Sequence, residues 1–159
     1  MNSTQTLLSG SKVACYFVSM SPKPNKTHAT TASVSAFIDK QPKEEVRDAP
    51  QYCGSRTLMK LMHDLTGEEP CMYEPTIVSY GTYHYKYASG RVGDAPLLAF
   101  SPRKPELVIY VYQEVLGPEL LAKLGKHKAT KGCVYVKRLA DIDMGVLKTM
   151  FKKSIAVVR

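Results

Sequence analysis

Apolar and polar positions divide the chain into a polar N-terminal segment, a helical segment, a run of strands and a final helix. Residues 1–32 are rich in Ser, Thr, Asn and Lys, and no apolar period is sustained there. Such a composition cannot bury enough apolar surface to fold, so we expect a disordered tail. Within this tail, we expect Met20 to be the first residue of the natural protein. The domain is expected to cover residues 33–159.

Two helices are expected after the tail. Ser33 is suited to cap a short helix over the letters VSAFI. A second helix is expected from Pro42, which suits a first turn, and it should end before Gly67. Its buried face follows the spacing i, i+3, i+4, i+7, at Leu58, Leu61, Met62 and Leu65. Pro50 and Gly54 lie inside this segment and predict a kink or a break.

Short β-branched and aromatic runs follow, in the order CMYE, TIVSY, TYHYKY, PLLAFS and ELVIYVY. Their short connections favour antiparallel pairing. A small helix over PELLAKL, a basic loop GKHKATKG and a last strand CVYVKRL come next. From Asp143 a final helix is expected, with a stripe at Leu147, Met150, Phe151, Ile155 and Val158. This order predicts an α+β fold, in which five to six antiparallel strands carry the N- and C-terminal helices on one face.

Alternating tyrosines are the most distinctive feature of the predicted strands. Because side chains alternate across a strand, Tyr83, Tyr85 and Tyr87 share one face. If the strand faces coincide, a cluster of six forms with Tyr110, Tyr112 and Tyr135, while Leu107, Ile109 and Val111 point toward the helices. Two interpretations stay open: the rings complete the second face of the sheet, or they form a shallow ligand surface. Rings beside cations also bind single-stranded nucleic acid, although no RNP1-like run is present.

Charge is placed unevenly along the chain. The formal net charge is +8, with 22 Lys and Arg against 14 Asp and Glu. Residues 1–79 carry 8 of each kind, whereas residues 80–159 carry 14 basic and 6 acidic residues. The C-terminal half is therefore suited to attract nucleic acid, anionic metabolites or acidic proteins, or to keep the protein in solution.

Other features of the composition narrow the function classes. No apolar run approaches the roughly 20 residues that a membrane span needs, so we expect a cytoplasmic protein with no membrane partner. The four cysteines are isolated and form no CxxC pair, which favours thiols over zinc sites or disulfides. No nucleophile or zinc-protease motif is present, so no catalytic residue is expected. The loop GKHKATKG does not satisfy the phosphate-loop pattern, but Lys126, Lys128 and Lys131 could still hold an anion there.

Two long stretches, TGEEPCMYEPTIVSYGTYHYKYASGRVGDAPLLAFSPRK and LAKLGKHKATKGCVYVKRLADID, together resemble the YdhG-like domain family, a group of small, mostly uncharacterised bacterial proteins. The resemblance covers residues 33–158. Matching positions in the first stretch are Gly81, Tyr83, Tyr85, Gly90, Arg91, Gly93, Asp94, Pro96, Phe100, Ser101, Pro102, Arg103 and Lys104. Later matches are Leu124, Gly125, Lys126, Lys128, Lys131, Cys133, Tyr135, Leu139 and Asp141.

The resemblance implies an α+β sandwich and a link to frataxin-like iron chaperones. Such chaperones hold iron on exposed carboxylates, and the candidates here are Glu68, Glu69, Glu74 and Asp94. A basic surface repels iron cations at long range, which weakens this link. The chain also departs from the family: Tyr73-Glu74 stand where Trp-Gly is usual, and Ala95 stands where a Trp usually follows Gly93-Asp94.

These observations predict a non-catalytic protein that binds a small anionic ligand or a metal ion. The expected site consists of Tyr83, Tyr85, Arg91, Asp94, Arg103 and Lys104. In this hypothesis the tyrosines supply apolar contact and hydroxyl hydrogen bonds, and the arginines orient a carboxylate or phosphate bidentately. Iron is the one cofactor that the resemblance suggests. The alternative is binding of nucleic acid or an acidic protein through the basic C-terminal half.

Overall fold

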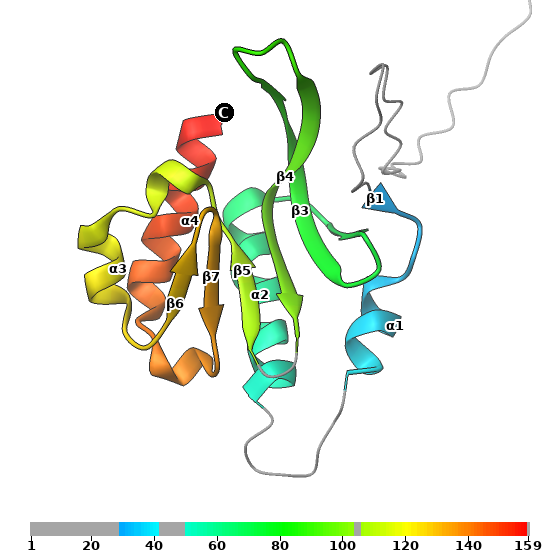
Figure 1. Cartoon of the computed structure of the whole chain (residues 1–159). Coiled ribbons are helices and arrows are strands. Elements are labelled where there is room, and N and C mark those ends of the chain that lie inside the picture. The colour runs from blue at the N-terminus through cyan, green and yellow to red at the C-terminus, as the bar shows by residue number, and fades with distance from the viewer. Residues whose placement is uncertain (1–28, 42–49, 104–105, 159) are drawn as a thin grey trace, which may run out of the picture.

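The computed structural model describes residues 29–41, 50–103 and 106–158, which form one antiparallel sheet with helices on one face (Figure 1). The described strands lie in the order β1-β2-β3-β4-β5-β7-β6. They are β1 (Ala29–Thr30), β2 (Pro70–Tyr73), β3 (Ile77–Lys86), β4 (Val92–Pro102), β5 (Leu107–Tyr110), β6 (Lys128–Thr130) and β7 (Cys133–Val136). The helices are α1 (Val34–Asp39), α2 (Pro50–Thr66), α3 (Pro118–Leu124) and α4 (Met144–Val158), with short 3-10 turns η1 (Gln113–Val115) and η2 (Leu139–Asp141). The predicted α+β class is confirmed.

Seven described strands exceed the five to six that the sequence predicts. The short β1 and β6 add two edge strands, and β6 lies inside the segment that was expected to be a basic loop. In the other direction, the two runs TIVSY and TYHYKY form the single strand β3. Gly81 stands at the joint between them with a φ of 62°, a left-handed conformation that glycine adopts without steric cost.

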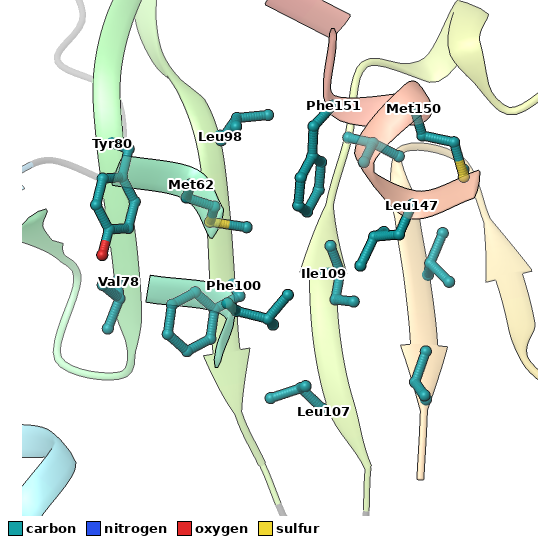
Figure 2. Close-up of a cluster of buried hydrophobic side chains, with 14 of the residues drawn as sticks. Met62, Val78, Tyr80, Leu98, Phe100, Leu107, Ile109, Leu147, Met150 and Phe151 are labelled. Atoms are coloured by element: carbon teal, nitrogen blue, oxygen red, sulfur yellow. The ribbon is translucent and has the colours of Figure 1, made fainter. Parts of the chain in front are cut away.

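The hydrophobic core lies between the sheet and the helices α2 and α4 (Figure 2). The strands contribute Val78, Tyr80, Leu98, Phe100, Leu107 and Ile109, and the helices contribute Met62, Leu147, Met150 and Phe151. All ten are essentially buried. Burial of one large apolar side chain stabilises the fold by about 1.5–3 kcal/mol, so this face supplies most of the stability.

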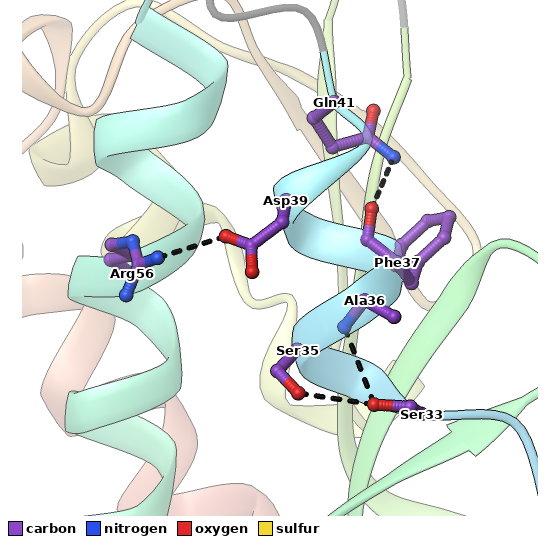
Figure 3. A network of polar contacts seen from close by, with 7 residues as sticks. All are labelled: Ser33, Ser35, Ala36, Phe37, Asp39, Gln41 and Arg56. Carbon is purple, nitrogen blue, oxygen red and sulfur yellow. Dashed lines mark hydrogen bonds and ion pairs between the residues drawn. The ribbon is translucent and has the colours of Figure 1, made fainter.

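Helix α1 begins as predicted. The Ser33 hydroxyl accepts a hydrogen bond from the Ala36 amide at 3.3 Å, which satisfies one of the free amides of the first turn. At the other end, Arg56 of α2 reaches Asp39 at 3.2 Å (Figure 3). This exposed ion pair is worth about 0–1 kcal/mol, and it joins α1 to α2 on the surface.

Helix α2 is described from Pro50, while residues 42–49, where a start was predicted at Pro42, lie outside the described residues. Gly54 lies within α2, and the helix continues through it without the predicted break. A Cβ at Gly54 would lie 3.4 Å from Leu139 Cγ and 3.6 Å from Leu107 Cδ2. These are ordinary van der Waals distances, so the position has room for a Cβ and the packing of α2 does not depend on the glycine. The predicted end is confirmed, since Gly67 follows the helix with a φ of 69°.

The last helix also begins as predicted at Asp143. Its carboxylate oxygen Oδ1 accepts hydrogen bonds from the amides of Gly145 at 2.7 Å and Val146 at 3.0 Å. Of the predicted stripe, Leu147, Met150 and Phe151 are buried.

Among the described residues, no helix combines the length and the apolar character that crossing a bilayer requires.

The outer half of the β3–β4 hairpin stands apart from the rest of the sheet, and we call residues 82–96 the arm. Within the described strands, residues 82–86 and 92–96 pair only with each other, because the pairing of β3 with β2 ends at Tyr80 and the pairing of β4 with β5 ends at Ala99. Figure 1 shows the arm extending beyond the helices. Its tip is a turn in which Gly90 has a φ of 81°.

Candidate functional site

The sheet face opposite the helices carries polar and aromatic side chains, and we call it the open face. Strand register places Ser101 beside Val108, Val108 beside Tyr135, and Tyr135 beside Lys128. The neighbouring row on the same face consists of Cys71, Ser79, Ala99, Tyr110, Cys133 and Thr130. Ser79, Ala99 and Ser101 are small and buried, so they form the floor of this face near its centre.

The six tyrosines share the open face, as the alternation predicts, and ring contacts join four of them. The rings of Tyr112, Tyr83, Tyr85 and Tyr87 follow one another with centroid distances of 6.2, 6.5 and 5.1 Å. Tyr110 and Tyr135 stand on adjacent strands on the same side. Leu107, Ile109 and Val111 belong to the core on the helix side, as the alternation predicts.

Small residues across the hairpin make room for these rings. The partner of Tyr83 on β4 is Ala95, and the partner of Tyr85 is Gly93. Both rings are half-buried, whereas Tyr87 at the arm tip is 59% exposed. Tyr73 of β2 extends the cluster, because its hydroxyl donates to the Asp94 carbonyl at 3.2 Å. The sequence signal for this placement was alternation: the apolar Met72 directly precedes Tyr73, and neighbouring side chains of a strand point to opposite faces.

Burial changes the acidity of two tyrosines on the open face. Burial raises the pKa of Tyr83, and the nearby Tyr112, Tyr87, Tyr85 and Tyr73 add to this effect. Burial also raises the pKa of Tyr110, while the positive charge of Arg103 opposes the rise. The hydroxyls of Tyr83 and Tyr110 are therefore neutral hydrogen-bond donors and acceptors at physiological pH.

Arg103 is a cation of the open face that two hydroxyl groups contact. Its Nε donates to the Ser101 hydroxyl at 3.2 Å, and that hydroxyl donates to the Thr76 carbonyl at 2.5 Å. Its Nη2 donates to the Tyr110 hydroxyl at 3.5 Å. Glu106, a nearby acid in sequence, pairs with Lys128 at 2.9 Å. Within the described part of the chain, no carboxylate forms an ion pair with Arg103.

The structure does not bring the six predicted site residues into one place. Tyr83 and Tyr85 stand on the arm, Arg91 lies in its tip, and Arg103 follows the opposite end of β4. The 11 residues of β4 separate the two arginines by a strand length of about 35 Å. Lys104 lies outside the described residues.

Asp94 is turned away from the tyrosine rings. Its Oδ1 lies 2.9 Å from Nδ1 of His84, its partner across the hairpin. Since positions 84 and 94 alternate with 83 and 95, this pair occupies the side of the arm opposite Tyr83 and Tyr85. The carboxylate therefore cannot serve the same ligand as those rings.

The basic segment after α3 is ordered by backbone contacts. His127 Nδ1 lies 2.8 Å from the Gly125 carbonyl, and the amide of Lys126 donates to the Asp141 carbonyl. Lys128 is engaged by Glu106. A Cβ at Gly125 would lie 2.5 Å from the Asp141 carbonyl oxygen, so glycine is needed for this close approach. These contacts indicate a structural turn rather than a cradle of amides directed at an anion.

A hollow of about 440 Å³ lies elsewhere, between η1, α3 and α4. Glu114, Lys153 and Val157 are among its lining residues. None of the predicted site residues reaches it. In the described ranges, no group of three or more His, Cys, Asp or Glu side chains is placed to hold a metal ion.

Compared with protein-family models, curated proteins and solved structures, the chain matches none of them.

Proposed function

We propose that the protein is a non-catalytic binder of a small anionic ligand, held on the open face at Arg103. The observation that carries this proposal is the position of the guanidinium. Hydroxyls of Ser101 and Tyr110 hold it in place, and no described carboxylate neutralises it. A fixed guanidinium is suited to bind a carboxylate or phosphate through two parallel hydrogen bonds.

The surroundings of Arg103 favour a ligand with a planar apolar part. The rings of Tyr110 and Tyr135 lie on adjacent strands beside it. The floor consists of the small side chains of Ser79, Ala99 and Ser101. A tyrosine offers an apolar ring face together with a hydroxyl. An aromatic carboxylate or a nucleoside monophosphate combines both requirements, because each joins a flat ring to an anion.

The anionic version has more support than the iron version. The carboxylates that the resemblance suggests for iron are dispersed: Asp94 pairs with His84, and Glu74 lies in the turn between β2 and β3. Glu69 lies close enough to Tyr80 to influence its pKa. Hard cations require several oxygen ligands at one point, which these positions do not supply.

Membership of the YdhG-like family remains part of this proposal, and the backbone of one turn supports it. Glu74, which stands where the family usually has glycine, has a φ of 64°. A non-glycine residue costs about 1–2 kcal/mol in this left-handed conformation. The resemblance leads us to expect a backbone that favours glycine at this position, and the left-handed φ of Glu74 agrees with that expectation.

A thermal-shift screen with benzoate, adenosine monophosphate, inorganic phosphate and citrate tests the proposed ligand class. A ligand at about 100 times its Kd should stabilise the protein by roughly 2.7 kcal/mol. We expect benzoate or the nucleotide to act, and Arg103→Ala to abolish the effect. Lys148→Ala on α4, which removes the same charge from the helix side, is the matched control. Stabilisation that survives in Arg103→Ala would refute the site, and a response to none of the four probes would refute the ligand class.

A further inference from the structure

The arm presents an uncommon surface, because one side of a two-stranded ribbon is a continuous row of tyrosine rings. Tyr83 and Tyr85 follow one another along β3, Tyr87 comes directly after the strand, and Tyr112 continues the row at the root of the arm. Each ring lies within 6.5 Å of the next, measured between centroids. Strand geometry explains the row, since every second residue repeats at about 6.8 Å on one face.

The exposure of this row increases toward the tip. Tyr83 and Tyr85 are half-buried, while Tyr87 is 59% exposed. Among the described residues, the exposed large hydrophobic side chains are Tyr87 and Val157, and Tyr87 is the more exposed of the two. Because Gly93 and Ala95 lie opposite Tyr85 and Tyr83, no bulky side chain on β4 covers the outer ring faces at these pairs. The arm thus offers flat aromatic surface to solvent.

Cations stand at both ends of the row. Arg91 lies beside the tip, where its carbonyl accepts a hydrogen bond from the Tyr87 amide at 2.8 Å. Lys131 lies beside the root, because its neighbour Gly132 accepts the Val111 amide at 3.0 Å, next to Tyr112. Both side chains are exposed, and neither forms an ion pair with a described carboxylate. They belong to residues 80–159, whose 14 basic and 6 acidic residues give a charge of +8.

We propose that the arm binds single-stranded nucleic acid, with unpaired bases stacked on Tyr87 and Tyr85 and phosphates held by Arg91 and Lys131. Aromatic rings recognise unpaired bases through their faces, which a duplex keeps inside its own stack. The cations complement the charge of a phosphate backbone at the ends of the row. This second site is independent of the proposed ligand at Arg103, which lies at the far end of β4.

Fluorescence anisotropy with a labelled oligothymidine of about 15 nucleotides tests the proposal, since single-strand sites span roughly 4–16 nucleotides. We expect binding at about 50 mM salt that weakens as salt increases. Tyr87→Ala and Tyr85→Ala should each weaken binding about 5- to 150-fold, which corresponds to the stacking of one base. Tyr87→Phe should bind as the natural protein does, because it keeps the ring.

Charge variants separate stacking from general attraction. Arg91→Ala should lower the slope of log affinity against log salt by about 0.7, the contribution of one phosphate contact on a single strand. Lys148→Ala on α4 should leave that slope unchanged. Measuring Arg103→Ala in the same assay keeps the two proposals distinguishable, because oligothymidine binding should survive it.

Four results would overturn the proposal. Absence of binding at low salt is the first, and undiminished binding by Tyr85→Ala and Tyr87→Ala is the second. Equal affinity for a duplex or for heparin would show that charge alone is responsible. Loss of a dimer in Tyr87→Ala, measured by sedimentation, would show that the row contacts a second copy of the chain instead.

Discussion

The two faces of strand β4 are built from alternate residues and have opposite character. Leu98 and Phe100 point toward α2 and α4 and are completely buried in the core. Ala99 and Ser101 point the other way and are equally buried, yet they lie among tyrosine hydroxyls and the Arg103 guanidinium. One face therefore holds the fold together by apolar packing, while the other organises polar groups on a flat floor. This difference assigns stability to the first face, and the second is the face for which we propose binding.

Truncation on the helix face should have the largest effect. Phe100→Ala removes a fully buried ring from the centre of the core and should lower the free energy of unfolding by about 3–5 kcal/mol. Tyr87→Ala, at the exposed end of the other face, should change it by less than about 0.5 kcal/mol. Urea unfolding measures the change for each variant, with an m-value equal to that of the natural protein. Similar losses for the two variants would break the contrast between the faces.

The second-largest effect should come from alkaline pH, which should lower the stability of the protein through a buried tyrosine on the helix face. Burial, with a further effect from Glu69, raises the pKa of Tyr80 far above its usual value, so the folded protein keeps this proton longer than the unfolded chain. The stability that this provides is complete below about pH 10 and is lost as pH rises, by about 1.4 kcal/mol per unit. Tyr80→Phe should flatten the decline of stability between about pH 10 and 11.5. An unchanged slope in this variant would contradict the buried ionisation.

The turn that sets the register of both faces should respond to a smaller change. Glu74→Gly relieves a left-handed backbone and should raise the free energy of unfolding by about 0.5–1 kcal/mol. Glu74→Ala is the matched control, since it removes the charge and keeps the strained conformation. Thermal unfolding distinguishes the two. A glycine variant less stable than the alanine variant would show that the side chain of Glu74 matters more than its backbone.

Much of this two-faced sheet could be predicted from alternation alone. The tyrosines of β3 were assigned to one face, and Leu107, Ile109 and Val111 to the other, because a strand has a period of two residues. The class of fold followed from the order of helices and strands. The alternation carries this information locally, without knowledge of strand pairing.

The shape of the site could not be predicted in the same way. Arg91 and Arg103 were placed in one site, but whether two turns meet depends on the length of β4, and this strand holds them apart. Asp94 was grouped with the tyrosines, although its pairing with His84 places it behind them. The contact between Ser101 and Arg103 also depends on strand pairing, because Thr76 and Tyr110 must lie beside β4 to bind the Ser101 hydroxyl and the guanidinium. These features arise from register and strand length, which a single sequence does not specify.

Calorimetric titration of the Arg103→Lys variant tests the central claim most directly. Lysine keeps the positive charge but lacks the planar fork that Ser101 and Tyr110 orient. Using benzoate or adenosine monophosphate, whichever stabilises the natural protein, we predict at least about tenfold weaker binding, a loss of about 1.4 kcal/mol, with unchanged thermal stability of the free protein. Equal affinity of the lysine variant would show that the open face attracts anions by charge alone and does not orient them.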